Sequence, residues 1–146
     1  MRGVKQFNDY IKEGIVKIQT PDRSRASYLL EESKKSYEFL CKKISAFGVS
    51  DETANDLLKS SYDIIMELIR AKMLLQGHNA TGQGAHEAEV AFLRKLNFKE
   101  KDVQFANQMR YFRNGTLYYG TIIDKEYAQK VIEFTRKIYT QINKKL

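Results

Sequence analysis

The sequence predicts an all-α protein, an antiparallel up-and-down bundle of four core helices with an N-terminal helix and one short extra helix. Apolar residues recur at helical spacing along almost all of the 146 residues. Strand signals are nearly absent, apart from a β-leaning stretch over residues 118–123. Helix start and stop signals separate the apolar runs, which predicts short turns between neighbouring helices.

The first twenty residues predict a helical extension that precedes a main helical domain over residues 21–146. Gly14 weakens this first helix by about 1 kcal/mol relative to alanine. The apolar residues that share one face of it are Val4, Phe7, Ile11, Ile15 and Ile18.

The first core helix is expected over residues 21–47. Thr20 is a favourable N-cap, and Pro21 suits the first turn because its missing N–H has no helical partner there. Gly48 suits the C-terminal stop. The side chains expected to face the core are Tyr28, Leu30, Tyr37, Leu40, Cys41, Ile44 and Phe47.

The second core helix is expected to begin after Ser50 as its N-cap and to end at Gly77. Asp51 and Glu52 fall in its first turn, where the helix macrodipole favours negative charge. Residues 77–85 contain three glycines and predict the one long loop. The core side chains expected from this helix are Leu57, Leu58, Ser61, Ile65, Leu68, Ile69 and Leu75.

A short helix over residues 86–96 and two long helices complete the predicted bundle. The third core helix begins near Lys99, and Asp124 caps the last one. The stripe of the third helix consists of Val103, Ala106, Arg110, Arg113 and Leu117. The buried set of the last helix consists of Tyr127, Val131, Phe134, Ile138 and Ile142.

Composition gives a general indication of the partner and the compartment. The formal charge of +7 and a pI of about 9.4 favour acidic partners, nucleic acid above all, although scattered lysine pairs serve solubility equally well. A single cysteine, Cys41, and the lack of a signal sequence predict a cytoplasmic protein. No apolar run predicts a membrane span, no His or Cys spacing indicates a metal site, and no cofactor is expected.

The candidate chemistry is concentrated at Arg113 and Asn114, near the end of the third core helix. A guanidinium is an always-charged fork of donors, which suits phosphate or carboxylate. The following Asn114-Gly115 pair is a turn signal, so the helix is expected to fray there and to leave Arg113 at an edge. Arg110 lies one turn earlier and projects to a neighbouring position.

Simpler interpretations of the same residues stay open. Both arginines fit surface charges, and Arg113 also fits an ion pair with Asp63 or Glu67 on a neighbouring helix. The nearby rings of Tyr118 and Tyr119 suit base stacking, but they suit a dimer surface equally well.

Several sequence pieces follow one another in a specific order and spacing. They are residues 25–30 (RASYLL), 62–65 (YDII), 71–77 (AKMLLQG), His86 at the start of a short helix, and 109–114 (MRYFRN) before a Tyr-Gly pair. In this arrangement residues 25–146 resemble a HEPN domain, the small helical domain of many prokaryotic RNase toxins, and are most similar to its single-domain prokaryotic branch. The first twenty residues lie outside the resemblance.

The resemblance implies metal-independent RNA cleavage in which the ribose 2′-hydroxyl attacks the adjacent phosphate. The family signature is an arginine, a polar residue and a histidine about four residues further on. Arg113 and Asn114 match it, as the groups that stabilise and orient the phosphate, but Tyr118 stands in the histidine position. Phenol has an unperturbed pKa of about 10 and is a poor base near neutral pH. The site is therefore expected to bind phosphate and to be catalytically weak or dead.

His86 is the candidate replacement for the missing base. At a helix N-terminus the macrodipole disfavours its protonated form, which leaves a neutral imidazole able to accept a proton. A capping or packing role explains His86 equally well. His78 falls in the expected loop and is predicted to be solvated.

The resemblance also implies a homodimer whose two arginine motifs face each other across a two-fold axis. Many family members pair with a nucleotidyltransferase antitoxin, which in some systems modifies a tyrosine near the motif. This makes Tyr118 or Tyr119 the candidate acceptor. The hypothesis is a protein that binds RNA or nucleotide phosphate through Arg110, Arg113, Tyr119 and His86, with endoribonuclease activity as its stronger form. The alternatives are a non-catalytic dimeric module that partners a nucleotidyltransferase or another protein, and a structural dimer without a ligand.

Overall fold

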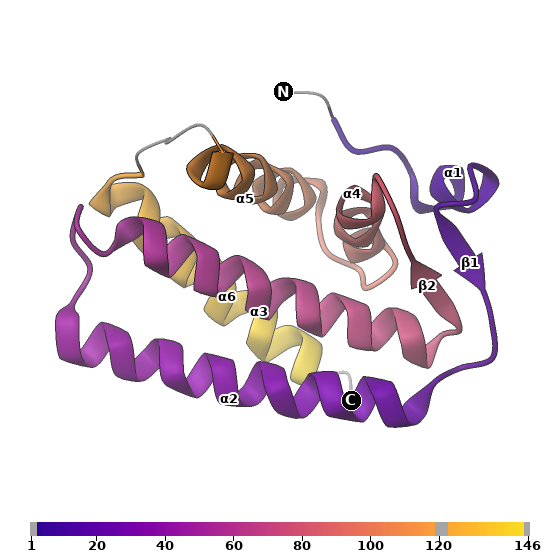
Figure 1. Ribbon diagram of the computed structural model, residues 1–146, viewed down its shortest axis with the longest axis horizontal. Helices are drawn as coiled ribbons and strands as arrows, with labels where there is room; N and C mark the ends of the chain where they lie inside the picture. The colour runs from indigo at the N-terminus through magenta and orange to yellow at the C-terminus, as the bar shows by residue number, and fades with distance from the viewer. Residues whose placement is uncertain (1–2, 119–122, 145–146) are drawn as a thin grey trace.

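The computed structural model describes residues 3–118 and 123–144, and it confirms the all-α prediction (Figure 1). The two short strands pair with each other, and four long helices form the body of the molecule. The elements are α1 (Phe7–Lys12), β1 (Val16–Ile18), α2 (Arg23–Phe47), α3 (Ala54–Leu75), β2 (His78–Ala80), α4 (Ala85–Ala91), the 3₁₀ turn η1 (Phe92–Arg94), α5 (Glu100–Tyr118) and α6 (Lys125–Lys144).

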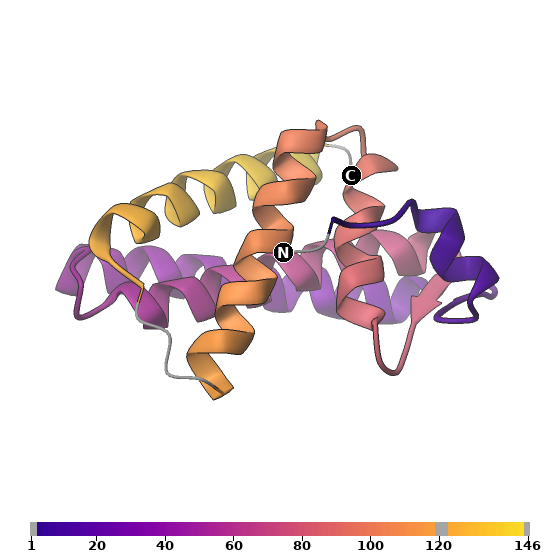
Figure 2. The same ribbon diagram turned by 90° about the horizontal axis from the view of Figure 1, so that it is seen from above.

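Helix α3 is the central element of the bundle. It packs against α2 on one side, α6 on another, and α4 and α5 on a third (Figure 1). Its buried residues extend from Ala54 to Leu74 and cover most of its circumference, which is typical of a helix enclosed by neighbours. Helix α5 runs across α3, as Figure 2 shows, so the C-terminal half of α5 lies over the middle of α3.

The start of α2 lies two residues later than expected. Asp22, and not Thr20, is the N-cap, and its carboxylate accepts a hydrogen bond of 3.0 Å from the backbone N–H of Arg25. The preceding backbone is tied to the end of α3, because Gln19 N–H donates to the Gly77 carbonyl at 2.8 Å and Asp22 N–H to the Leu74 carbonyl at 3.0 Å. This extended connection keeps Thr20 from capping the helix. Gly48 ends α2 with φ 73°, as predicted.

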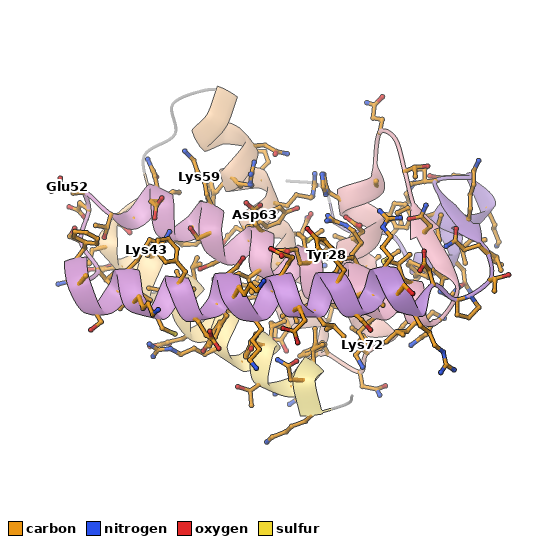
Figure 3. All side chains as sticks on the ribbon, turned by 60° about the horizontal axis from the view of Figure 1, so that its bottom comes forward. Tyr28, Lys43, Glu52, Lys59, Asp63 and Lys72 are labelled. Carbon is orange, nitrogen blue, oxygen red and sulfur yellow. The ribbon has the colours of Figure 1, made fainter. Side chains whose placement is uncertain are left out.

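Two side chains expected in the core from α2 face solvent instead. Tyr28 is 64% exposed and Phe47 is 74% exposed (Tyr28 is labelled in Figure 3). Helix α2 packs mainly on α3 and forms an outer layer, so its buried stripe is narrower than the apolar pattern suggests. Leu40 is buried as predicted.

The turn before α3 is longer than expected, and Thr53 replaces Ser50 as the N-cap. Ser50 N–H donates to the Thr53 hydroxyl at 3.1 Å, and Thr53 N–H donates to the Ser50 hydroxyl at 3.3 Å. This reciprocal pairing holds residues 50–53 in a turn. Asp51 is therefore free to accept a hydrogen bond of 2.7 Å from Lys125 N–H, at the start of α6.

The prediction of one N-terminal helix through Ile18 is wrong. Helix α1 ends at Lys12, Gly14 takes φ 79°, and β1 pairs antiparallel with β2, so that Val16 lies opposite Ala80 and Ile18 opposite His78. Glycine permits the positive φ that turns the chain out of the helix, and the β-branched residues after it suit a strand. The same pairing converts part of the expected loop over residues 77–85 into β2.

The N-terminal segment joins the main hydrophobic core. Phe7 and Tyr10 are buried, and the Phe7 ring meets Phe92 edge-on at 4.9 Å and His78 at 5.2 Å. His78 is therefore packed and not solvated as predicted, and burial lowers its pKa. Arg94 donates to the Val4 carbonyl at 2.9 Å, which fastens the segment to η1.

Helix α5 does not fray at Asn114-Gly115 as the sequence suggested. It continues to Tyr118, and Gly115 is buried. Packing over α3 offsets the roughly 1 kcal/mol that glycine costs inside a helix. Most of the β-leaning stretch over 118–123 lies outside the described residues.

The end of the chain follows the prediction more closely. Asp124 caps α6, with its carboxylate accepting a hydrogen bond of 2.8 Å from Tyr127 N–H. The expected short helix over 86–96 is present as α4 and η1, and it begins one residue earlier, at Ala85. Across the residues that the structure describes, no helix has the length and apolar character needed to span a membrane.

Gly77 provides a test of how the N-terminal segment is joined to the bundle. It takes φ 76°, and a Cβ there would collide with the backbone oxygen of Gln19. We expect Gly77→Ala to lower the free energy of unfolding by at least about 2 kcal/mol, measured by urea denaturation.

Gly82→Ala is the matched control for this test. Gly82 takes φ 77°, but a Cβ at that position would meet no atom within 4 Å. Gly82→Ala should therefore lower the free energy of unfolding only by the cost of placing a non-glycine residue at positive φ, about 1 kcal/mol. Equal losses in the two variants would show that the approach of Gln19 to Gly77 does not constrain the fold.

Candidate functional site

A cavity of about 440 Å³ lies where α3, α4 and α5 meet, and we call it the Arg113 pocket. It brings together three of the candidate residues, Arg113, Asn114 and His86, from two helices. The full lining consists of Leu29, Tyr62, Asp63, Met66, Glu67, Arg70, His86, Arg113 and Asn114. Residues far apart in the sequence are thus assembled into one concave site by the crossing of α5 over α3.

The Arg113 guanidinium pairs with Asp63, one of the two partners that the sequence suggested. Its Nε lies 3.3 Å from Asp63 Oδ1, and Asp63 on α3 is 56% exposed (Figure 3). The Arg113 Nε is buried and forms no aligned hydrogen bond within the described part of the chain. A half-solvated ion pair of this kind contributes about 0–1 kcal/mol. Arg113 is therefore weakly held and remains part of the cavity wall.

Tyr62 places a buried hydroxyl beside this cation. The Arg113 Cζ lies 5.9 Å from the centre of the Tyr62 ring. Burial raises the pKa of Tyr62 far above its usual value, even though Arg110 and Arg113 act to lower it. The hydroxyl thus keeps its proton at neutral pH, and it has no hydrogen-bond partner among the described residues. An unsatisfied buried hydroxyl costs about 1–3 kcal/mol, which an oxygen-bearing ligand would relieve.

A buried carboxylate forms the floor of the site next to His86. The Glu89 side chain is 2% exposed, and it accepts hydrogen bonds from Arg70 Nε at 2.6 Å and Arg70 Nη2 at 3.2 Å. His86 Nδ1 lies 3.1 Å from Glu89 Oε1. Burial acts to raise the pKa of Glu89, but the hydrogen bonds from His86 and Arg70 outweigh it and lower the pKa. Glu89 is therefore ionised at neutral pH.

The contact with Glu89 orients the His86 imidazole. An ionised carboxylate accepts a hydrogen bond, so Nδ1 carries the proton and Nε2 of the neutral ring is left as the acceptor. The His86 side chain is 63% exposed, which leaves the ring accessible. Gly84 and not His86 occupies the N-cap of α4, so the capping role considered for His86 is wrong.

Sequence reasoning missed Tyr62, Arg70 and Glu89. One signal was available, because His86 and Glu89 stand three apart on a short helix and Glu89 lies within an apolar run. A carboxylate in such a run needs a cationic or hydrogen-bonding partner. That Arg70 of α3 is this partner follows only from the packing of α4 on α3.

Arg110 lies three residues before Arg113 on α5, and the two side chains line different cavities. Its Nε donates to Asn107 Oδ1 at 3.0 Å, and its side chain lines another cavity of about 510 Å³ with Lys5, Tyr10 and Tyr111. The structure thus does not bring Arg110 into the Arg113 pocket. Among the other predicted site residues, Tyr119 and the side chain of Tyr118 lie outside the part of the chain that the structure describes.

A neighbouring cavity shares one wall with the Arg113 pocket. It measures about 500 Å³, and His86 and Arg70 line both cavities. The rest of its lining includes the cation Arg25 from α2 and two polar side chains, Asn79 of β2 and Thr81 directly after it. His86 therefore stands between two concave sites that each contain an arginine.

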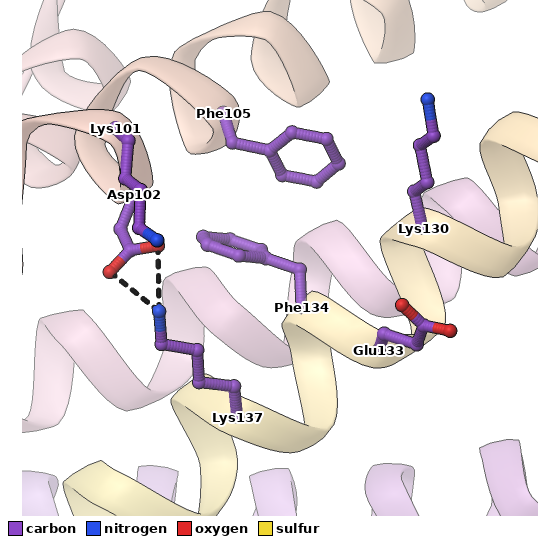
Figure 4. Close-up of a pocket in the computed structure, with 7 residues that line it drawn as sticks. All are labelled: Lys101, Asp102, Phe105, Lys130, Glu133, Phe134 and Lys137. Carbon is purple, nitrogen blue, oxygen red and sulfur yellow. Dashed lines mark hydrogen bonds and ion pairs between the residues drawn. The ribbon is translucent and has the colours of Figure 1, made fainter.

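The cavity in Figure 4 has a different character. It lies between α5 and α6, measures about 410 Å³, and contains Phe105 and Phe134. Lys137 Nζ donates to both carboxylate oxygens of Asp102 at 2.9 Å, so the buried acid is already neutralised. None of the residues that line this cavity is among those whose buried side-chain polar atoms lack a hydrogen-bond partner within the described structure. The Arg113 pocket is the better candidate because two of its buried donors, Arg113 Nε–H and the Tyr62 hydroxyl, form no hydrogen bond with the residues that the structure describes.

No protein-family model, no curated protein and no solved structure matches this chain. Over residues 3–118 and 123–144, no three His, Cys, Asp or Glu side chains come together in a group suited to a metal ion. The Arg113 pocket offers guanidinium, hydroxyl, amide and imidazole groups, which are the groups that recognise oxyanions.

Arg70→Met tests the buried ion pair that holds α4 on α3. The change keeps an apolar stem but leaves the Glu89 carboxylate without its bidentate partner, so we expect a loss of about 2–4 kcal/mol in urea denaturation. The Arg70→Met/Glu89→Leu double variant should recover much of this loss, because it removes both charges.

Lys43→Met is the control for a solvated pair. Lys43 reaches from α2 to Asp56 of α3 at 2.7 Å, and Asp56 is 64% exposed (Lys43 is labelled in Figure 3). Its loss should stay below about 1 kcal/mol. A similar small loss for Arg70→Met would contradict a structural role for the Arg70–Glu89 pair.

Proposed function

We propose that this protein binds RNA or nucleotide phosphate in the Arg113 pocket. The observation that carries the proposal is the presence of two buried donors in one cavity, Arg113 Nε–H and the Tyr62 hydroxyl, that have no hydrogen-bond partner within the described structure. A phosphate offers several charged oxygens at once and would satisfy both. Hydrogen bonds to a charged acceptor are the strong ones, contributing about 1.5–3 kcal/mol each.

The acidic residues of the pocket must be reconciled with an anionic ligand. Asp63 is mostly solvated and can leave Arg113 at little cost. Burial, together with the charges of Asp63 and Glu32, raises the pKa of Glu67 and so moves that carboxyl toward its neutral form. Glu89 is neutralised by Arg70. The excess charge of +7 on the whole chain adds long-range attraction for a polyanion.

A ligand with more than one phosphate fits the site better than a single small anion. The two cavities on either side of His86 present Arg113 in one and Arg25 in the other. Successive phosphates of an RNA strand, or the phosphate chain of a nucleotide, would engage both arginines. The resemblance to HEPN domains favours RNA among these ligands.

The remaining parts of the hypothesis stay predictions from that resemblance. The homodimer with facing arginine motifs and the nucleotidyltransferase partner are included in the proposal on that ground. The cytoplasmic location is included on the ground of the single cysteine, Cys41. A non-catalytic dimeric binding module is the alternative. It agrees with the presence of Tyr118 where the family signature has histidine.

Arg113→Gln tests the proposal directly. We expect affinity for a labelled single-stranded oligouridylate to fall at least about tenfold, because a charge-assisted contact to phosphate is lost. The slope of log affinity against log salt should fall by about one. Fluorescence anisotropy over a salt series measures both quantities.

The control for this measurement is Arg136→Gln, which removes the same charge from the exposed face of α6. It should leave the affinity nearly unchanged at moderate salt. An equal loss in the two variants would mean that only overall charge attracts the RNA. No loss in Arg113→Gln would refute the proposed site.

Asp63→Asn provides a test in the opposite direction. It removes the carboxylate that competes with a ligand for Arg113, so affinity for the same oligonucleotide should rise about two- to fivefold, the size of a solvated ion pair. Asp56→Asn, which breaks the exposed pair with Lys43 elsewhere on α3, is the control for the general charge change. A gain in both variants, or in neither, would argue against competition at Arg113.

A further inference from the structure

The cavity of about 510 Å³ that contains Arg110 is not used by the proposed function, and we call it the Arg110 cavity. It lies between the N-terminal segment, α4 and α5, and Figures 1 and 2 show this segment passing from α1 over α4 toward α5. Its volume is typical of small-molecule sites, which measure about 300–1,000 Å³. Four charged side chains line it, namely Lys5 and Glu13 of the N-terminal segment, Glu87 of α4 and Arg110 of α5.

Two of these four charges neutralise each other. Lys5 Nζ donates to the Glu13 carboxylate, and both side chains are 43% exposed. The same ammonium lies 5.2 Å from the centre of the Tyr10 ring. The pair therefore adds no net charge to the cavity.

The Arg110 guanidinium is held in place, but it has no acidic partner. Its Nε donates to Asn107 Oδ1 at 3.0 Å, and Asn107 is fully buried, which fixes the orientation of the guanidinium. Within the described chain, no carboxylate lies at ion-pairing distance from Arg110. Its terminal nitrogens therefore remain as charged donors in the cavity.

Glu87 presents a carboxylate to the same cavity, and no cation of the residues described here forms an ion pair with it. The nearby Tyr10 side chain is fully buried, and its hydroxyl accepts a hydrogen bond of 3.2 Å from Lys5 N–H. Burial and the Glu87 carboxylate raise the pKa of Tyr10 to about 12, while Arg110 acts to lower it. Glu87 and Arg110 thus both lie near one protonated hydroxyl, without pairing with each other.

The Arg110 cavity therefore offers one unpaired cation and one unpaired anion side by side. A polyanion such as RNA suits it poorly, because the Glu87 carboxylate would repel phosphate. A ligand that carries an ammonium and a carboxylate would satisfy both charges, and hydrogen bonds between charged groups are the strong ones. Ile15 and the ring of Tyr111, which is 57% exposed, add apolar surface to the same lining.

We propose that the Arg110 cavity binds a free α-amino acid with an apolar side chain. Arg110 binds the carboxylate of the ligand, Glu87 binds its ammonium group, and Ile15 and Tyr111 contact its side chain. The proposal does not depend on RNA binding, because Arg113 lines a different cavity. It gives the N-terminal segment a part in a ligand site, since this segment forms one wall of the cavity.

The experiment measures binding of L-leucine to the whole chain by isothermal titration calorimetry, with L-phenylalanine as a second probe. N-acetyl-L-leucine keeps the carboxylate but lacks the ammonium group, and L-leucinamide keeps the ammonium group but lacks the carboxylate. We expect saturable binding of leucine, and at least about tenfold weaker binding of each derivative, because each loses one charge-assisted contact.

Two variants assign each contact to a residue. Arg110→Gln and Glu87→Gln should each lower the affinity for leucine at least about tenfold. Arg110→Gln should also bind leucine and leucinamide about equally, since its carboxylate contact is already lost. Glu87→Gln should bind leucine and N-acetyl-leucine about equally for the corresponding reason. A purely structural role for either residue would not change this preference between ligands.

The matched controls are Arg136→Gln and Glu38→Gln, which remove the same charges from exposed positions on α6 and α2. Both should bind leucine with the wild-type affinity. Circular dichroism and urea denaturation establish that each variant is folded. Chemical-shift mapping on the wild-type chain requires no variant, and leucine should shift the backbone amide signals of Gly84 and Tyr111 more than that of Lys130, which lines another cavity.

Several results would overturn the proposal. One is the absence of saturable binding of both leucine and phenylalanine at millimolar concentration. Another is equal affinity of the wild-type chain for leucine and its two derivatives, because the cavity would then not recognise a zwitterion. Wild-type affinity in a folded Arg110→Gln or Glu87→Gln variant, or shifts that do not include Gly84 and Tyr111, would place the ligand elsewhere. None of these results affects the proposed binding of RNA at Arg113.

Discussion

The burial of α3 on most of its circumference is the constraint on which the rest of the structure depends. Neighbours on three sides leave little room for polar side chains on this helix. The polar side chains of α3 that line the Arg113 pocket are Tyr62, Asp63, Glu67 and Arg70, and they lie where α4 and α5 diverge over α3. The cavity is a consequence of this arrangement. Helices α4 and α5 pack on α3 at different points along its length, so their side chains do not fill the space between them.

The Glu89 carboxylate makes the polar part of the site rigid. An ion removed from water is tolerated only with partners, and here Arg70 and His86 supply them from α3 and from the same short helix. The pair fixes the position of α4, which would otherwise be held by a few apolar residues. The Arg113 side of the pocket is the opposite case. It has a half-solvated ion pair, and two of its buried donors form no hydrogen bond with the residues that the structure describes. Glu89 and Arg70 thus form a rigid side of the site, whereas Arg113 on the other side can exchange Asp63 for a ligand. This combination suits reversible binding.

Much of the fold could be predicted from periodicity and from cap residues. The long helices, the stop at Gly48 and the cap at Asp124 follow from local chemistry that operates within a few residues. The strand pairing of β1 with β2 could not be predicted, because Val16 and Ile18 show their preference for a strand only when residues 78–80 lie beside them. The continuation of α5 through Asn114-Gly115 also depended on a distant element, since the packing of α5 on α3 outweighs the local turn preference.

The amino-acid sequence by itself determined the helical class and the presence of a guanidinium and an amide side by side at Arg113 and Asn114, because the apolar period and a permanent charge are local properties. It also singled out His86 without deciding between a structural and a chemical role. Only the tertiary structure decided which groups share a cavity: it placed Glu89 and Arg70 behind His86, paired Arg113 with Asp63, and directed Arg110 elsewhere. The physical reason is that the partner of a charged side chain in the site comes from the helix packed beside it. Which helices pack together depends on residues throughout the chain and not on the local sequence.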